Sequence, residues 1–230
     1  MNKKLITTIC LVFTLALAGC QNTTRNKDVD PRLQQNDDIE FFSKSGMTAC
    51  AAGAAAGALA CLAVSSDNRS VCMIAAAVAG CGIGIGTNAY LDNQRKKYAN
   101  KEQQLNAMIS DIQQENKRLQ SASSTAKAVI ADDKRALAKI SEDISQKHLD
   151  KAAAEKKLKG IDANIAALNK TLTSMKKRQS EWQEISGKSA ERGMKTSKLD
   201  TQITEMKTQV SSLQQELDSL YTQRSAIKIS

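Results

Sequence analysis

A heptad repeat of apolar residues runs from Leu105 to Trp182 without a slip, and it restricts this chain to a small number of folds. A repeat sustained over about eleven heptads predicts long helices that pack along a shared apolar seam. We therefore expect an elongated all-α protein whose first long helix covers residues 92–186. The a positions include Ile109, Asn116, Ile130, Leu137, Ile144, Leu158, Ile165 and Leu172. The d positions include Leu105, Ile112, Leu119, Ile140, Ile161, Leu168, Met175 and Trp182.

Polar residues interrupt this seam near the serine-rich stretch 121–125 and around residues 147–151. Polar residues at a or d positions commonly fix the register or the choice of partner, at some cost in stability. The seam is therefore expected to be weakest at these two places. The polar residues are Asn116, Ser123, Asp133, Lys147 and Lys151.

A second apolar seam follows in residues 196–230, shifted by three residues from the first register. Gly187 and Gly193 lie between the two seams, which predicts a turn over residues 187–195. We expect the second helix to fold back antiparallel on roughly residues 150–186. The alternative is one extended rod in a parallel oligomer. The second seam consists of Leu199, Ile203, Met206, Val210, Leu213, Leu217, Leu220 and Ile227.

The composition and charge agree with a helical coil that has a solvated surface. Aromatic residues make up only 3% of the chain, and there is a single proline. The formal net charge is +9, and residues 91–230 hold 26 basic against 18 acidic side chains. Because these charges alternate along the helix faces and no aromatic residues are interleaved for base stacking, we expect no nucleic-acid partner. Attraction to anionic lipid is the main alternative use of the basic surface.

Two uncharged stretches rich in alanine and glycine precede the coil, at residues 46–66 and 70–91. As a helix, each would span roughly 30 Å, the thickness of a bilayer's hydrocarbon core. Small residues recur at every third or fourth position, a spacing that lets helices approach closely in lipid. We expect a helical hairpin over residues 46–91 that packs through Gly53, Gly57, Gly80, Gly82, Gly84 and Gly86.

This hairpin resembles the glycine-zipper two-helix domains of bacterial outer-membrane lipoproteins, of the 17-kDa surface antigen type. The resemblance covers about residues 46–91 and lies in composition. Many related proteins continue into a peptidoglycan-binding domain, which we do not find in this sequence, so peptidoglycan binding is not expected. The alternative is a water-soluble alanine-rich hairpin that packs against the coil or against itself.

Near the N-terminus, Lys3 and Lys4 are followed by an uncharged, mostly apolar stretch over residues 5–18. This stretch is too short to span a membrane and has the length of a signal-peptide core. The sequence Leu-Ala-Gly-Cys at residues 17–20 resembles the lipobox of bacterial lipoproteins. The resemblance implies a signal peptide over residues 1–19 and a mature chain that begins at an acylated Cys20. The alternative is an ordinary secretory signal or a short anchor.

Residues 20–45 are polar and contain the only proline, which predicts a flexible tether after the lipid. Phe41 and Phe42 would either enter the membrane interface or cap the next element. In enterobacterial lipoproteins an aspartate after the acylated cysteine usually retains the protein at the inner membrane. Gln21 occupies that position, so the resemblance implies the outer membrane, with the chain facing the periplasm.

Four cysteines lie within the predicted hairpin and are candidates for disulfides: Cys50, Cys61, Cys72 and Cys81. An even number of cysteines in an oxidising compartment is typical of disulfide pairing. A hairpin that turns near residues 67–69 would place Cys61 opposite Cys72, and Cys50 roughly opposite Cys81. The spacing of Cys72 and Cys81 does not fit a single face of a regular helix, so the second pair is less well supported. A metal site is the alternative, but the segment has no histidine and no Cys-x-x-Cys pair.

The sequence shows no catalytic motif, and its only histidine, His148, is expected to be a solvated coil residue. Together these features predict a non-enzymatic envelope lipoprotein, without cofactor or metal apart from the covalent lipid on Cys20. Its coiled coil would project from the membrane into the periplasm as a structural or interaction module. Its partners would be membrane lipid, a protein bound through the coiled coil, and further copies of itself. The alternative function is a membrane-active component of a pore or secretion assembly, which oligomerises through the glycine-zipper hairpin.

Overall fold

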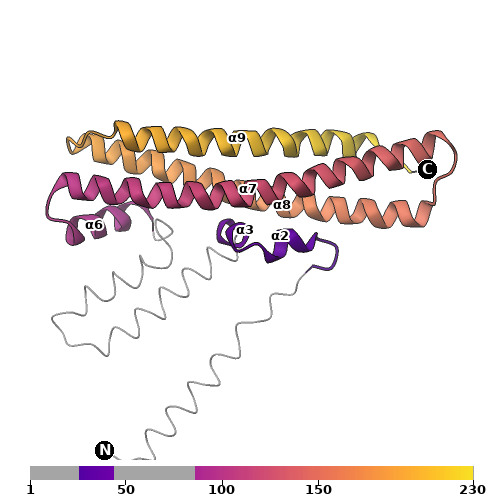
Figure 1. Ribbon diagram of the computed structural model, residues 1–230, viewed down its shortest axis with the longest axis horizontal. Coiled ribbons are helices and arrows are strands. Elements are labelled where there is room, and N and C mark those ends of the chain that lie inside the picture. The colour runs from indigo at the N-terminus through magenta and orange to yellow at the C-terminus, as the bar shows by residue number, and fades with distance from the viewer. Residues whose placement is uncertain (1–25, 44–85, 230) are drawn as a thin grey trace, which may run out of the picture.

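The computed structural model describes residues 26–43 and 86–229, and every regular element within these ranges is a helix. The long helices lie alongside one another in an elongated bundle (Figure 1). The expected all-α class, with long helices that fold back, is confirmed. The helices are α2 (Pro31–Gln35), α3 (Asp37–Phe42), α6 (Thr87–Lys97), α7 (Lys101–Ser145), α8 (Lys151–Glu191) and α9 (Ser197–Ala226).

The chain reverses direction twice among its long helices, so that α8 is antiparallel to both α7 and α9 (Figure 1). The predicted fold-back of the last helix is present, and the ion pair between Arg224 and Asp162, at 2.8 Å, joins the end of α9 to the first part of α8. The prediction of one helix over residues 92–186 is wrong, because the chain also turns at residues 146–150. As a result α9 packs along both α7 and α8.

The turn between α7 and α8 has a capping geometry that is usually built on glycine. Lys147 takes the left-handed backbone conformation, with a φ of 57°. The N–H groups of Lys147 and His148 donate to the carbonyls of Ile144 and Asp143. This is the Schellman motif, in which glycine normally occupies the left-handed position. Asp150 then caps α8 by accepting a hydrogen bond from the third residue of the helix at 3.0 Å.

The turn between α8 and α9 uses the same motif with glycine in its usual place. Gly193 has a φ of 77°, and the N–H groups of Gly193 and of the next residue donate to the carbonyls of Ala190 and Ser189. Only one of the two glycines in this region is therefore needed for the reversal. The predicted turn over residues 187–195 is wrong in its first part, because α8 continues through Gly187.

Gly187→Ala should raise the free energy of unfolding by about 0.5–1 kcal/mol, because alanine is the better helix former inside a helix. A Cβ added at Gly187 would meet no atom within 4 Å, so nothing offsets this gain. The measurement is urea denaturation followed by circular dichroism. Gly193→Ala is the matched control and should lower stability, because alanine is strained at positive φ. A loss of stability in Gly187→Ala as well would show that the chain turns at residue 187.

The three long helices differ in how much of their surface they bury. α9 buries the two rows of its predicted seam, whereas α7 and α8 each bury a third row of residues. The two rows of α9 suffice for contact with α7 and α8, so the third rows must contact something else. The third row comprises Met108, Glu115, Ala122 and Val129 in α7, and Asn164, Thr171, Arg178 and Ile185 in α8.

α2, α3 and α6 cover the side of α7 and α8 that lies away from α9, as Figure 1 shows. Together they fill the fourth position of a four-helix bundle. The prediction that residues 20–45 form a flexible tether is therefore wrong for residues 26–43. Apolar side chains spaced for helices explain the docking, since Val29, Leu33, Ile39 and Phe42 are at most 9% exposed.

The last part of the predicted hairpin, residues 87–91, belongs to α6 and packs on the bundle. Tyr90 and Leu91 are at most 1% exposed there. The prediction that Gly86 packs helices together is also wrong, because Gly86 precedes α6 with a φ of 93° and a Cβ at this position would have no atom within 4 Å. Glycine at this position permits the positive φ and does not bring two helices into close contact.

Candidate functional site

The side of α7 and α8 that faces α2, α3 and α6, which we call the α7–α8 face, carries buried polar and charged side chains. Glu115, Asp133, Asn164 and Arg178 are each at most 5% exposed. A charge removed from water is costly unless it is paired and hydrogen-bonded. The partners of these four side chains therefore determine what the face can do.

The short helices follow one another along this face as one interrupted helix, antiparallel to α7. Arg32 of α2 donates to Asp132 at 2.7 Å, and Tyr90 of α6 donates to Asp111 at 2.6 Å. α3 lies between them and contacts both α7 and α8. Residue numbers therefore increase along the short helices in the direction in which they decrease along α7. Residues 44–85, which join α3 to α6, lie outside the described residues.

A buried ion pair lies at the centre of the α7–α8 face. Arg178 donates from Nε and Nη2 to the two carboxylate oxygens of Glu115, at 2.6 and 2.9 Å. The indole N–H of Trp182 donates to Glu115 at 3.0 Å. The ring of Phe41 in α3 lies between two guanidinium groups, with centroid distances of 4.9 Å to Arg118 and 5.5 Å to Arg178. These cation–π contacts connect α3 to both long helices.

α6 is held by an aromatic pair and a buried phenol. The rings of Tyr90 and Trp182 meet edge to face with centroids 5.7 Å apart, and the Tyr90 hydroxyl donates to Asp111. Burial is the main cause that raises the pKa of both Tyr90 and Asp111. Tyr90 therefore stays protonated and acts as a hydrogen-bond donor. Trp182, which the heptad pattern places at a d position, joins α8 to both α6 and α7.

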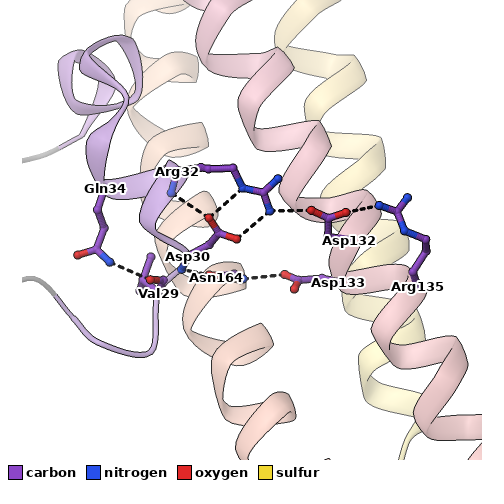
Figure 2. Close-up of polar contacts among 8 residues, drawn as sticks. All are labelled: Val29, Asp30, Arg32, Gln34, Asp132, Asp133, Arg135 and Asn164. Atoms are coloured by element: carbon purple, nitrogen blue, oxygen red, sulfur yellow. Dashed lines mark hydrogen bonds and ion pairs between the residues drawn. The ribbon is translucent and has the colours of Figure 1, made fainter.

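A more exposed ion cluster fixes α2, as Figure 2 shows. Arg32 pairs with Asp30 at 2.8 Å and with Asp132 at 2.7 Å, and Arg135 pairs with the second oxygen of Asp132. The hydrogen bond from Arg32 is the main cause that lowers the pKa of Asp30 and of Asp132. Because the Arg32 side chain is 44% exposed, these pairs contribute little stability but do orient the segment.

Below this cluster, Asn164 joins the N-terminal segment to α7 and α8 (Figure 2). Its Nδ2 donates to Asp133 at 2.9 Å, and its Oδ1 accepts from the backbone N–H of Asp30 at 2.7 Å. The chain also passes close to Gly160, one turn earlier in α8, where an added Cβ would lie in ordinary contact, 3.5 Å from the carbonyl oxygen of Asp28. The segment therefore docks through its backbone as well as its side chains.

Asp133→Asn should stabilise the protein at neutral pH, and the gain should shrink as the pH falls. Burial, opposed by the hydrogen bond from Asn164, raises the pKa of Asp133, whereas an unfolded aspartate titrates near pH 4 (about 3.9). Folding therefore favours the protonated carboxyl, and its contribution to stability is lost as the pH rises through the raised pKa. Asparagine removes this cost because it is uncharged and still accepts from Asn164.

Asp132→Asn is the matched control for this prediction, measured by urea denaturation across a pH series. The pKa of Asp132 is lowered, so its contribution is present at neutral pH and is lost as the pH falls. Asp132→Asn should therefore destabilise the protein slightly at neutral pH, because its ion pairs are exposed, and not in acid. If both variants shift stability in the same direction, burial is not what governs Asp133.

Most residues singled out from the sequence lie outside the described ranges and stay predictions: Cys20, Cys50, Cys61, Cys72, Cys81, Gly53, Gly57, Gly80, Gly82 and Gly84. His148 is exposed in the turn between α7 and α8. Of the polar seam residues, Asn116 donates to the carbonyl of Gln202 in α9 at 3.0 Å, whereas Lys147 and Lys151 lie exposed at the turn between α7 and α8. The charged residues of the α7–α8 face were not predicted as a site. Glu115 and Arg178 lie one position before the a row, whereas Asp133 lies at a d position and was predicted only as a polar interruption of the seam.

The α7–α8 face is suited to binding helices and shows no arrangement for nucleophilic or acid–base chemistry. Arg178 pairs with Glu115, and Asp133 accepts a hydrogen bond from the neutral Asn164. A cleft of about 430 Å³ beside Asp30, Arg32 and Asp133 is bordered by the ion cluster around Arg32. No group of acidic, histidine and cysteine side chains within residues 26–43 and 86–229 is arranged to hold a metal ion. The face thus acts as the surface that orders the N-terminal segments.

Comparisons with known proteins add no family to this description. No protein-family model matches the chain, and neither the curated proteins nor the solved structures give a significant match. None of the helices in the described ranges combines the length and the apolar character that a membrane span requires.

Proposed function

We propose that this protein is a non-enzymatic lipoprotein of the bacterial cell envelope, anchored by an acylated Cys20. The observation that carries this proposal is the order of features in residues 1–20: two lysines, a short apolar stretch, and Leu-Ala-Gly-Cys. The N-terminal acyl chains would supply the anchor. One acyl chain binds a bilayer reversibly, whereas two or more hold firmly, at about 0.8 kcal/mol for each buried methylene.

The described helices would form a structural or interaction module beside the membrane. The seams of α7, α8 and α9 are filled by one another and by the N-terminal segments, so no coiled-coil seam among the described residues is left for a partner. A protein partner would therefore bind exposed surface, such as the groove of about 460 Å³ between α8 and α9, which is lined by Lys176, Gln183, Lys207 and Gln214. The paired charges of the α7–α8 face also support a structural role.

Membrane fractionation with palmitate labelling tests the anchor. The wild-type protein should be labelled and recovered with membranes, and Cys20→Ala should lose the label. Cys10→Ala is the matched control, because Cys10 lies in the predicted signal peptide and should have no effect after processing. A wild-type protein recovered soluble and unlabelled, or label that persists in Cys20→Ala, would reject the proposal.

The proposed location is the outer membrane, with the bundle in the periplasm. Gln21 supports it, because aspartate at this position is the usual signal for retention at the inner membrane. Separation of inner and outer membranes by density should place the wild-type protein in the outer membrane and Gln21→Asp in the inner membrane. Gln21→Asn is the control for size and should stay in the outer membrane. If wild type is found with the inner membrane, the proposed location is wrong.

A further inference from the structure

We infer that the bundle lies along the bilayer surface, with α2, α3 and α6 toward the lipid and α9 away from it. This inference rests on the proposed anchoring at Cys20, and it specifies which surface of the protein the bilayer contacts. It replaces the expectation of a coil that projects away from the membrane. Its basis is the position at which each chain segment leaves the bundle.

The first attachment is short and leaves nearer the end of the bundle formed by residues 146–150, where Asp28 pairs with Lys159 at 2.9 Å. Only residues 21–25 separate Cys20 from Asn26, and six fully extended steps reach about 20 Å. Arg32 pairs with Asp132, and the part of α7 from Asp132 back to Lys101 rises about 46 Å at 1.5 Å per residue. The bundle therefore cannot stand on the end formed by residues 98–100 and 192–196.

The second attachment also leaves from the side of the bundle. The alanine- and glycine-rich stretches, which the sequence predicts to associate with lipid, begin three residues after Ser43, and the part of them that precedes α6 ends at Gly86. Gly86 lies beside α8, where the next residue, Thr87, donates to Glu184 at 3.0 Å, and Tyr90 contacts Asp111. From Asp111 to the end of α7 the rise is about 51 Å. Standing on that other end would lift Gly86 far above the bilayer.

Both attachments leave from the side that α2, α3 and α6 occupy, and α9 lies on the opposite side (Figure 1). Only an orientation along the surface keeps both of them near the lipid. Charge does not explain this orientation, because the acidic Asp37 and Glu40 of α3 are exposed, as are the three basic residues that end α6, Arg95–Lys97. The two attachments therefore fix the orientation, and it should not depend on salt concentration.

Energy transfer from single sites to a lipid dye measures this orientation. The acylated full-length protein is reconstituted in vesicles of phosphatidylethanolamine and phosphatidylglycerol that contain an acceptor lipid. A fluorescent amino acid introduced genetically avoids the native cysteines, and it replaces one exposed residue at a time. The four sites are Gln35 in α2, Gln146 and Lys195 at the two ends of the bundle, and Glu205 on α9.

Transfer should be strongest from Gln35, comparable from Gln146 and Lys195, and weakest from Glu205, at both low and high salt. Transfer from one end with little or none from the other would mean an upright bundle and would overturn the inference. Stronger transfer from Glu205 than from Gln35 would also overturn it, because the opposite side would then face the lipid. If the purified protein carries no acyl chains and shows no transfer from any site, the anchoring on which the inference rests is rejected instead.

Discussion

Arg178→Met should lower the free energy of unfolding by about 3–5 kcal/mol, because it leaves the carboxylate of Glu115 buried without its counterion. Both side chains are at most 6% exposed, and the guanidinium is bonded to both carboxylate oxygens. Methionine fills most of the space, so the loss reports mainly the unpaired charge. The same change removes one of the two cations that hold the ring of Phe41.

Two further variants isolate this effect in urea denaturation. Lys177→Met also replaces a basic side chain by methionine, one residue earlier, where the side chain is 62% exposed, and should change stability by less than about 0.5 kcal/mol. The double variant Glu115→Gln with Arg178→Met should recover much of the loss, because the neutral amide still accepts from Trp182. A loss in Arg178→Met no larger than in Lys177→Met would mean that the pair is not buried.

Phe42→Ala should release the N-terminal segment from the bundle while α7, α8 and α9 stay assembled. Removing a buried phenylalanine costs about 3–5 kcal/mol, and the Phe42 side chain is 1% exposed. α2 and α3 contain only five and six residues, far too few for stable isolated helices. The amide protons of residues 31–42 should therefore lose their protection against hydrogen exchange, whereas those of α7 keep it.

Glu40→Ala is the control on the same helix, since Glu40 is exposed. It should leave the exchange of residues 31–42 close to that of the wild type. Two results would contradict the proposed docking. One is unprotected amides at residues 31–42 already in the wild type, and the other is protection that survives in Phe42→Ala.

The sequence predicts the long helices and much of their packing, because apolar residues at heptad spacing form a seam that packs against a facing helix. Leu119, Leu168, Met175 and Trp182 are at most 1% exposed, as the repeat predicts. The fold-back of the last helix is also predictable, since a glycine lies between two seams of different register. The sequence misplaces the start of that turn, because two glycines were available and only Gly193 has the left-handed conformation.

The reversal between α7 and α8 is missed because its usual signal is replaced. Lys147 occupies the left-handed position that normally holds glycine. The heptad count also continues across the turn: Ile140 and Ala154 are two heptads apart and both are buried, although the chain reverses between them. The polar residues around 147–151 and the capping residue Asp150 were the only indications of a break.

The docking of residues 26–43 is missed because a polar, proline-containing segment suggests a tether. Its capping signals were nevertheless present. Asp30 precedes a proline at the first turn of α2, and Asn36 caps α3 by accepting from the backbone N–H groups of Asp38 and Ile39. The candidate site depends on contacts across large sequence separations, such as that between Asp30 and Asn164, and no single-chain periodicity predicts these.

The intact mass of the mature protein, extracted from membranes, tests the proposed anchoring most directly. We predict a chain that begins at Cys20 and carries a diacylglyceryl group on sulfur and a third acyl chain on the amine. A chain that begins at Cys20 with a free thiol, or one that still includes residues 1–19, would contradict the proposal that this bundle works while attached to lipid.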